Sequence, residues 1–461
     1  MSRSAPSWLG ALALVLVVTG GERAARAIDL LEQEDLSLSL DLEAAAGGFV
    51  TNNTNFGAGR IDLQSGAVSG DAQWGEGYVK PALSLDYDTS AAGALYGGVS
   101  GVGAITVGDG DAGGFTDGGD KKASLEALFA GWRSGSLVAE ALGEDALDLS
   151  AGRQDFQVGD GFLIWDGNLD TAGDGAYWLG PRTAFNFAGL AQIATGALGG
   201  QLFYLRADGD QGHTEPIGLN LDYALDDLGL GEDGTLGAMY LHVVDVDPDF
   251  EAELPRDGMQ VATLRLNGLR MPGLEDLGVH AQYAHEFGDG QNVDFDAQAF
   301  YVEPFYEFSS LPWTPTLAYR FAYFSGDPDP DDDEREDFDP LFYDYSRGWG
   351  TWIQGEITGQ YLLFNSNQIN HMVHLSAYPT EAIGIGAIYF HFDLDEKNYF
   401  GTPVGERDFA DEINVYVDWQ ATEQVFVSAL YGIALPGDAA EEVFGDDQPY
   451  QLFQIYTVVT F

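Results

Sequence analysis

Basic side chains are rare in this chain of 461 residues, which contains 19 Lys and Arg against 74 Asp and Glu. Their positions are informative because an arginine guanidinium binds carboxylates through a planar fork of N–H donors. Six of them lie in segments where apolar and polar residues alternate: Lys80, Arg133, Arg153, Arg206, Arg265 and Arg320. If these side chains line one path, they could guide an anionic polysaccharide, such as a uronic acid polymer, along it.

The same basic residues could instead pair with acidic residues of the same strands and only stiffen them. Arg206 is ambiguous because it shares its parity with the apolar Leu202 and Tyr204. Arg153 lies where the alternation breaks, and a β-bulge at Gly152–Arg153 would turn its side chain inward. Acidic residues also occupy the polar parity, namely Asp86, Asp148, Asp222, Asp296, Asp393 and Asp418.

Residues 158–182 combine Gly and Asp with aromatic side chains. A loop this rich in Trp and Tyr is expected to fold into the mouth of a barrel and narrow it. The alternative is an external aromatic cap or a contact between subunits. The residues predicted to form the constriction are Trp165, Asp166, Tyr177, Trp178 and Arg182.

Catalytic and metal-binding motifs are not evident. The chain has no Cys, which excludes thiol catalysis and thiolate metal sites, and it contains neither G-x-S-x-G nor H-E-x-x-H. His371 and His374 are three apart on an expected strand, so they point to opposite faces. The acidic run 327–339 lacks the Gly of an EF-type calcium loop and is expected to be a solvated loop. We therefore expect no enzyme, no metal site and no cofactor.

The elements that must position these residues are β-strands. Residues 36–43 alternate Leu with Ser, Asp or Glu, and comparable alternation continues to the C-terminus. The pattern predicts eighteen strands between 36–48 and 450–461, with residues 351–364 assigned to a loop that could fold inward. A soluble β-sandwich would also alternate. Strand length, aromatic residues near strand ends and the terminal Phe461 favour an all-β transmembrane barrel with long extracellular loops.

The net charge and the N-terminal segment limit the possible location and partners of the protein. A formal net charge of -55 argues against nucleic acid as a partner. Residues 1–27, with an apolar stretch and a small-x-small site at Ala25–Ala27, have the pattern of a signal peptide. We expect residues 28–461 to form one barrel domain in the outer membrane of a Gram-negative bacterium.

Two parts of the chain resemble the alginate export family of outer-membrane barrels. The first is 150–182, with Gly152-Arg153-Gln154 and Gly159-Asp160-Gly161. The second is 355–367, with Asn365-Ser366-Asn367, followed by 374–379 and 389–392. The resemblance implies a monomeric barrel of eighteen strands with a constricted, basic lumen that passes an anionic polysaccharide. It carries over only Arg153 as a site residue. The poverty of basic residues departs from that pattern and puts alginate itself in doubt.

Three functions follow from these observations. The first is passive passage of an anionic polysaccharide or related solutes through a loop-constricted outer-membrane channel. The second is a general or cation-selective porin for small solutes. The third is a secreted or surface β-protein that binds glycans. As partners we expect outer-membrane lipid, lipopolysaccharide and the barrel assembly machinery.

Overall fold

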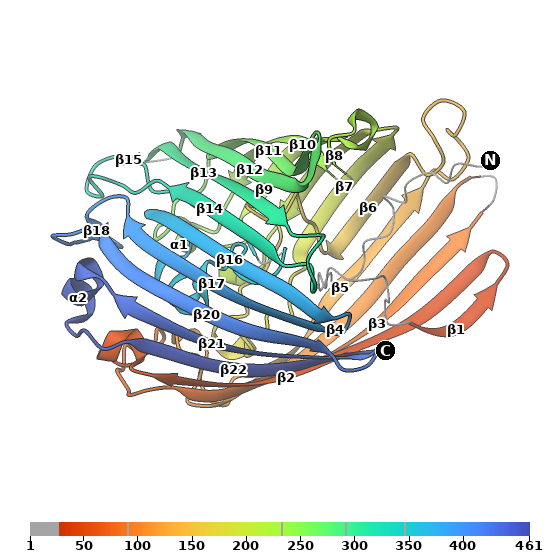
Figure 1. Ribbon diagram of the computed structural model, residues 1–461. Helices are drawn as coiled ribbons and strands as arrows, with labels where there is room; N and C mark the ends of the chain where they lie inside the picture. Colours follow the sequence, from red (N-terminus) through yellow and green to blue (C-terminus); the bar gives the residue numbers. More distant parts are fainter. Residues whose placement is uncertain (1–26, 90–91, 232–233, 291–292, 345–346) are drawn as a thin grey trace.

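The computed structural model describes residues 27–461 except 90–91, 232–233, 291–292 and 345–346. The proposed signal peptide, residues 1–27, thus lies almost wholly outside the described residues. Eighteen antiparallel strands form a closed barrel (Figure 1). The barrel closes where β2 pairs with β22, from Glu43 opposite Thr460 to Asn52 opposite Gln451.

The wall strands are β2 (Leu36–Asn52), β3 (Gln73–Asp88), β4 (Ala94–Gly108), β5 (Lys121–Arg133), β6 (Leu147–Gln154), β7 (Phe185–Thr195), β8 (Leu198–Arg206), β9 (Glu215–Ala224), β10 (Thr235–Asp245), β11 (Gln260–Met271), β12 (Leu274–Asp289), β13 (Asp294–Glu307), β14 (Thr316–Phe324), β16 (Gln368–Thr380), β17 (Ile383–Leu394), β20 (Asp408–Gln420), β21 (Val425–Pro436) and β22 (Tyr450–Thr460). Each corresponds to one strand expected from the sequence, so the predicted fold class is confirmed.

Short strands outside the wall were not predicted. β1 (Ile28–Gln33) pairs with residues 36–40 at the start of β2, and β15 (Glu334–Arg335) pairs in parallel with β13. β18 (Asn398–Tyr399) and β19 (Thr402–Pro403) form a small separate hairpin. Except for β1, these strands are only two residues long, which is too short for alternation to become visible.

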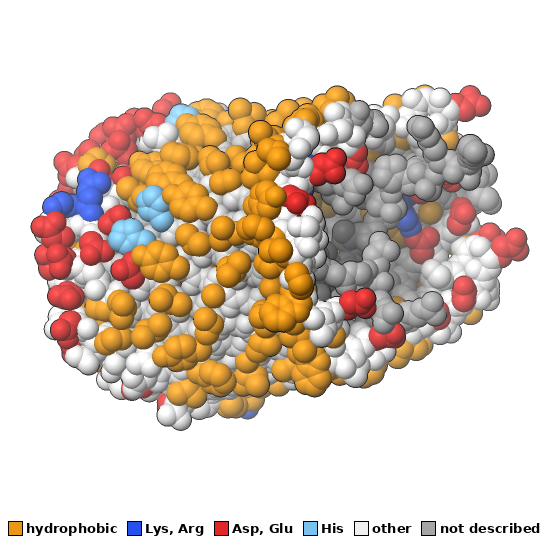
Figure 2. All heavy atoms as spheres, in the orientation of Figure 1, with side chains coloured by type: hydrophobic (Ala, Val, Ile, Leu, Met, Phe, Trp, Pro, Cys, Tyr) orange, Lys and Arg blue, Asp and Glu red, His pale blue; other side chains and the backbone are white. Residues whose placement is uncertain are grey.

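The alternation of the strands places apolar side chains outside and polar ones inside. In β9, Leu219, Leu221 and Tyr223 are exposed, whereas Asn220 between them is buried. The exposed apolar residues form a broad hydrophobic band across the face of the barrel seen in Figure 2. Such a band is the surface that a transmembrane barrel presents to lipid. Across the described residues, none of the helices has the length and apolar character of a membrane span.

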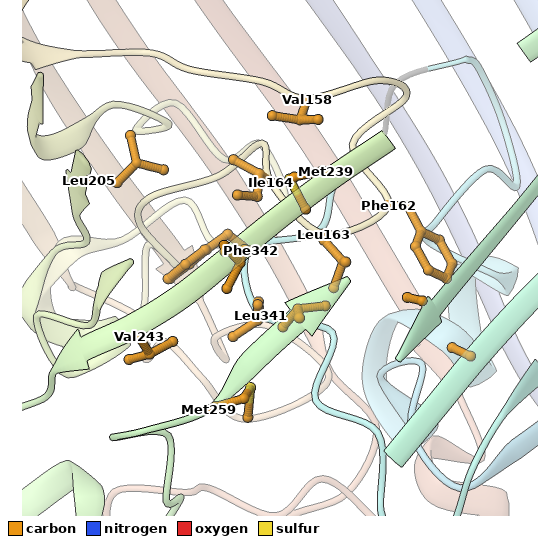
Figure 3. Close-up of a cluster of buried hydrophobic side chains, with 14 of the residues drawn as sticks. Val158, Phe162, Leu163, Ile164, Leu205, Met239, Val243, Met259, Leu341 and Phe342 are labelled. Atoms are coloured by element: carbon orange, nitrogen blue, oxygen red, sulfur yellow. The ribbon is translucent and has the colours of Figure 1, made fainter. Parts of the chain in front are cut away.

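Most of the long connections gather at one end of the barrel, and two of them turn inward. Residues 158–164 and 341–342 pack against inward-facing side chains of the wall, including Leu205 of β8 and Met239 and Val243 of β10 (Figure 3). The expected loop at 351–364 contains a buried helix of π type, Gly355–Leu363. Two short helices lie in other connections, α1 (Pro248–Glu251) between β10 and β11 and α2 (Asp438–Phe444) between β21 and β22.

A first prediction concerns the hydrophobic band. Leu264 lies near the middle of β11 and is 63% exposed. Leu264→Arg is expected to lower the free energy of unfolding in lipid by about 2–4 kcal/mol, because it places a charge near the bilayer midplane. Val244→Arg, near the loop end of β10, is the matched control and should cost only about 0–1 kcal/mol. Urea unfolding in vesicles measures both, and equal costs would contradict this orientation of the barrel in the bilayer.

Candidate constriction of the barrel

Two inserted segments, 155–184 and 325–367, meet inside the barrel and hold each other. The backbone N–H groups of Trp165 and Asp166 both donate to the carbonyl of Phe342, at 2.8 and 3.0 Å. Phe342 in turn donates to Leu163 at 3.0 Å. The indole of Trp352 donates to the carbonyl of Asp160 at 2.9 Å. The two segments therefore form one packed unit across the interior.

Buried glutamates of the wall bind the backbone of the segment 155–184. Glu76 on β3 accepts from the N–H of Leu179 at 2.9 Å and from Trp178 at 3.3 Å. Glu126 on β5 accepts from Thr183 and Ala184, at 2.9 and 3.1 Å. A buried N–H needs a partner, and a carboxylate is a strong acceptor. These contacts fix the place where the segment crosses the lumen.

The segment 325–367 is held in the same way by glutamates on two other strands of the wall. Glu412 on β20 accepts from Ile357 at 3.1 Å and from Thr358 at 2.7 Å, at the start of the buried helix. Glu286 on β12 accepts from the N–H of Asp339 at 3.0 Å. Both glutamates are buried. None of the four wall glutamates was predicted from the sequence, although each lies on the polar parity of its strand.

A buried ion network joins both segments to the wall. Arg320 on β14 lies 3.3 Å from Glu303 on β13 and donates to the carbonyl of Gly350 at 2.5 Å. Arg347 contacts Glu303 at 2.8 Å and Asp160 at 3.1 Å. Arg320, one of the predicted path residues, is only 1% exposed. It stabilises the inserted segment and does not present a free charge.

Three other predicted path residues also face inward and are also paired. Lys80 lies 3.5 Å from Glu126 and donates to the carbonyl of Pro181 at 3.0 Å. Arg133 forms an ion pair with Asp86. Arg265 pairs with Asp222 and is fully buried. Their charges are therefore compensated within the wall.

Arg153 lies at the end of β6, where a bulge was expected. The expected bulge is present, since the pairing register shifts between Gly152 and Gln154. Arg153 contacts Asp208 and Asn186, both at 2.9 Å.

The structure corrects the placement of Arg206. It shares the outward face of β8 with the exposed Leu202, and its partner is Glu215 at 3.2 Å. The alternation of β8 continues to its end, so Arg206 cannot turn into the lumen.

The residues predicted for the constriction lie in the segment 155–184, where Arg182 is buried and the other four are partly buried. Trp178 contacts Phe49 of β2, with ring centroids 5.0 Å apart, and Tyr177 stacks on Phe115 at 4.3 Å. Arg182 is buried and paired with Asp170. Trp165 and Asp166 hold the second inserted segment through their backbone, as described above.

Burial also changes the acidity of this segment. It raises the pKa of Asp166 well above its ordinary value, and the nearby Asp344 carboxylate adds to the effect. It raises the pKa of Asp170 to about 7, although the Arg182 guanidinium opposes the shift.

Comparison with known proteins agrees with this architecture. The family described as Alginate export matches residues 256–451. This range includes the second of the two resembling parts, 355–367 with 374–379 and 389–392, but not the first, 150–182. No curated protein matches the chain in sequence.

Solved outer-membrane barrels are similar in fold. Pseudomonas aeruginosa OccK8 (OprE) has a TM-score of 0.58 at 12% identity, covering 92% of this chain and 98% of that one. Acinetobacter baumannii OccAB2 and a BenF-like porin from Pseudomonas fluorescens Pf-5 both have a TM-score of 0.57 at 10% identity, with the same coverage. At these identities the likeness concerns the fold. The family resemblance expected from the sequence is thus confirmed over residues 256–451, within a barrel of the outer-membrane porin type.

The wall glutamates generate a second prediction. Glu412→Ala leaves the N–H groups of Ile357 and Thr358 without their acceptor, at a cost of about 1–3 kcal/mol for each buried group. We expect faster hydrogen exchange across 355–363 while the strand amides stay protected. Glu442→Ala is the matched control, since Glu442 is exposed and accepts from the N–H of Gly405. Unchanged exchange in Glu412→Ala would contradict the anchoring role.

A third prediction concerns pH. Burial raises the pKa of Glu356, in the inserted helix, from 4.5 to about 8. Between these values the folded protein binds more protons than the unfolded chain, so this group's contribution to stability is lost as pH rises. The unfolding temperature of the wild type should therefore fall more steeply between about pH 5 and pH 8 than that of Glu356→Gln. Heat-modifiable gel mobility measures this difference, and parallel curves would exclude the effect.

Proposed function

We propose that the chain is a passive outer-membrane channel for small solutes that prefers cations. The closed barrel, its outer hydrophobic band and its inserted segments support a narrowed channel. The choice of solute rests on one observation, the pairing of the six predicted path residues. Each has a carboxylate partner, none farther than 3.5 Å.

The exposure of the partners supports the sign of the preference. In the pair Arg265–Asp222 the carboxylate side chain is 31% exposed and the arginine 1%. In Arg133–Asp86 the values are 41% for the acid and 26% for the base. In both pairs the carboxylate is more exposed to a passing solute than the guanidinium, whereas in Lys80–Glu126 the base is the more exposed partner, at 16% against 1%. Rings of such acids favour cations over anions.

Passage of an anionic polysaccharide is the second candidate, and the family match over 256–451 favours it. It requires unpaired basic groups along the path. Among the basic residues that the sequence singled out, the described contacts leave none without an acidic partner. We therefore rank this function below a cation-preferring channel.

The proposal includes the setting of the channel. The signal peptide at 1–27, insertion by the barrel assembly machinery, contact with lipopolysaccharide and a monomeric state all belong to it. It assigns transport to the chain and no catalysis. Heat-modifiable mobility in outer-membrane fractions tests the setting, whereas recovery as a soluble protein would favour a secreted glycan-binding protein.

A fourth prediction tests the selectivity. In planar bilayers under a KCl gradient, the reversal potential should show preference for K⁺, and Asp222→Asn combined with Asp86→Asn should reduce it. Asp296→Asn is the matched control, because this acid lies beside His285 and is 62% exposed. Anion preference, or current block by an oligo-uronate, would instead support polysaccharide passage.

A further inference from the structure

A cluster on the outside of the barrel has no part in the channel. His391 and Asp393 lie on β17, between the inward-facing Phe390, Phe392 and Leu394, which are all fully buried. Across the strand pair, Asp393 is opposite Asp408 and His391 is opposite Asp411. Histidines occur where the hydrophobic band meets the acidic loop end (Figure 2).

The ligand atoms of this cluster are close enough to share one ion. One atom from each of His391, Asp393 and Asp408 lies within 4.8 Å of the others. Nε2 of His391 is 3.3 Å from Asp393. Two ligands of a tetrahedral zinc ion, each at about 2.0–2.1 Å from the metal, are roughly 3.3 Å apart. The spacing of this imidazole and carboxylate therefore already matches an edge of such a site.

A fourth residue orients the histidine. Nδ1 of His391 lies 2.9 Å from Asp411, and Asp411 also accepts from the hydroxyl of Tyr389 at 2.6 Å. An Nδ1–H donated to Asp411 leaves Nε2 with its lone pair toward Asp393 and Asp408. Metal-ligating histidines characteristically have such a carboxylate partner on the other ring nitrogen, which fixes the tautomer and the ring.

We propose that His391, Asp393 and Asp408 bind a divalent first-row cation such as Zn²⁺, with Asp411 as a positioning residue. Imidazole with carboxylates is a donor set that suits such ions. Three protein ligands leave the fourth position of a tetrahedral site open for water or another oxygen. No metal site was expected from the sequence, in which His371 and His374 point to opposite faces. The site at His391 is not visible there, because the pairing of β17 with β20 brings His391 and Asp408 together.

The test uses the untagged, folded barrel in detergent micelles, stripped with a chelator and titrated with Zn²⁺ by calorimetry. The wild type should bind one ion tightly, and His391→Gln should lose this binding. Asp411→Asn should weaken it by about 10–100-fold while leaving the stoichiometry at one ion. Co²⁺ provides a second readout, since a four-coordinate site gives a visible absorption that His391→Gln should lack.

The matched control is His285→Gln. His285 is 38% exposed, close to the 34% of His391, and contacts a single acid, Asp296, at 2.8 Å. Its zinc binding should equal that of the wild type. The proposal is overturned if the wild type binds no zinc, if His391→Gln retains the tight site, or if both variants lose it equally. Full affinity in Asp411→Asn would overturn its positioning role. Heat-modifiable mobility verifies that each variant is folded.

Discussion

The backbone N–H and C=O groups of the inserted segments need hydrogen-bond partners inside the barrel. This requirement determines much of the interior. An N–H group removed from water without a partner is costly. Glu76, Glu126 and Glu412 provide acceptors at the points where the two segments reach the wall. Each carboxylate accepts two neighbouring N–H groups, so it fixes both the position and the direction of the chain. The narrowing of the barrel depends on these contacts.

The same requirement gives the basic residues their role. Arg320 and Arg347 converge on Glu303, and Lys80 lies beside Glu126. Removing one partner of such a buried pair would leave an uncompensated charge, which is far more costly than the loss of an exposed pair. The arginines and lysine therefore stabilise the inserted segments and have carboxylate partners of their own.

Alternation allows a chain with a net charge of -55 to present an apolar surface to lipid. Successive side chains of a strand point to opposite faces, so polar and apolar residues separate without any division of the chain into domains. Leu264 and Arg265 illustrate this, because one is 63% exposed and the next is 2% exposed. The acidic residues lie in the loops, at the rim and in the interior. The His391 cluster lies at the rim, where the apolar band ends.

The sequence by itself determined the barrel, because a period of two and the connections between alternating segments are local properties. All eighteen wall strands and the bulge near Arg153 were predictable from it. Alternation also indicated which side of each strand Lys80, Arg265 and Arg320 would occupy. Only the tertiary structure decided what those side chains contact. Glu303 and Arg347, for example, are 44 residues apart in the sequence, which is farther than a local pattern extends. Ion pairs, glutamate anchors and the His391 cluster all depend on register and on the path of the inserted segments, which a local pattern does not contain.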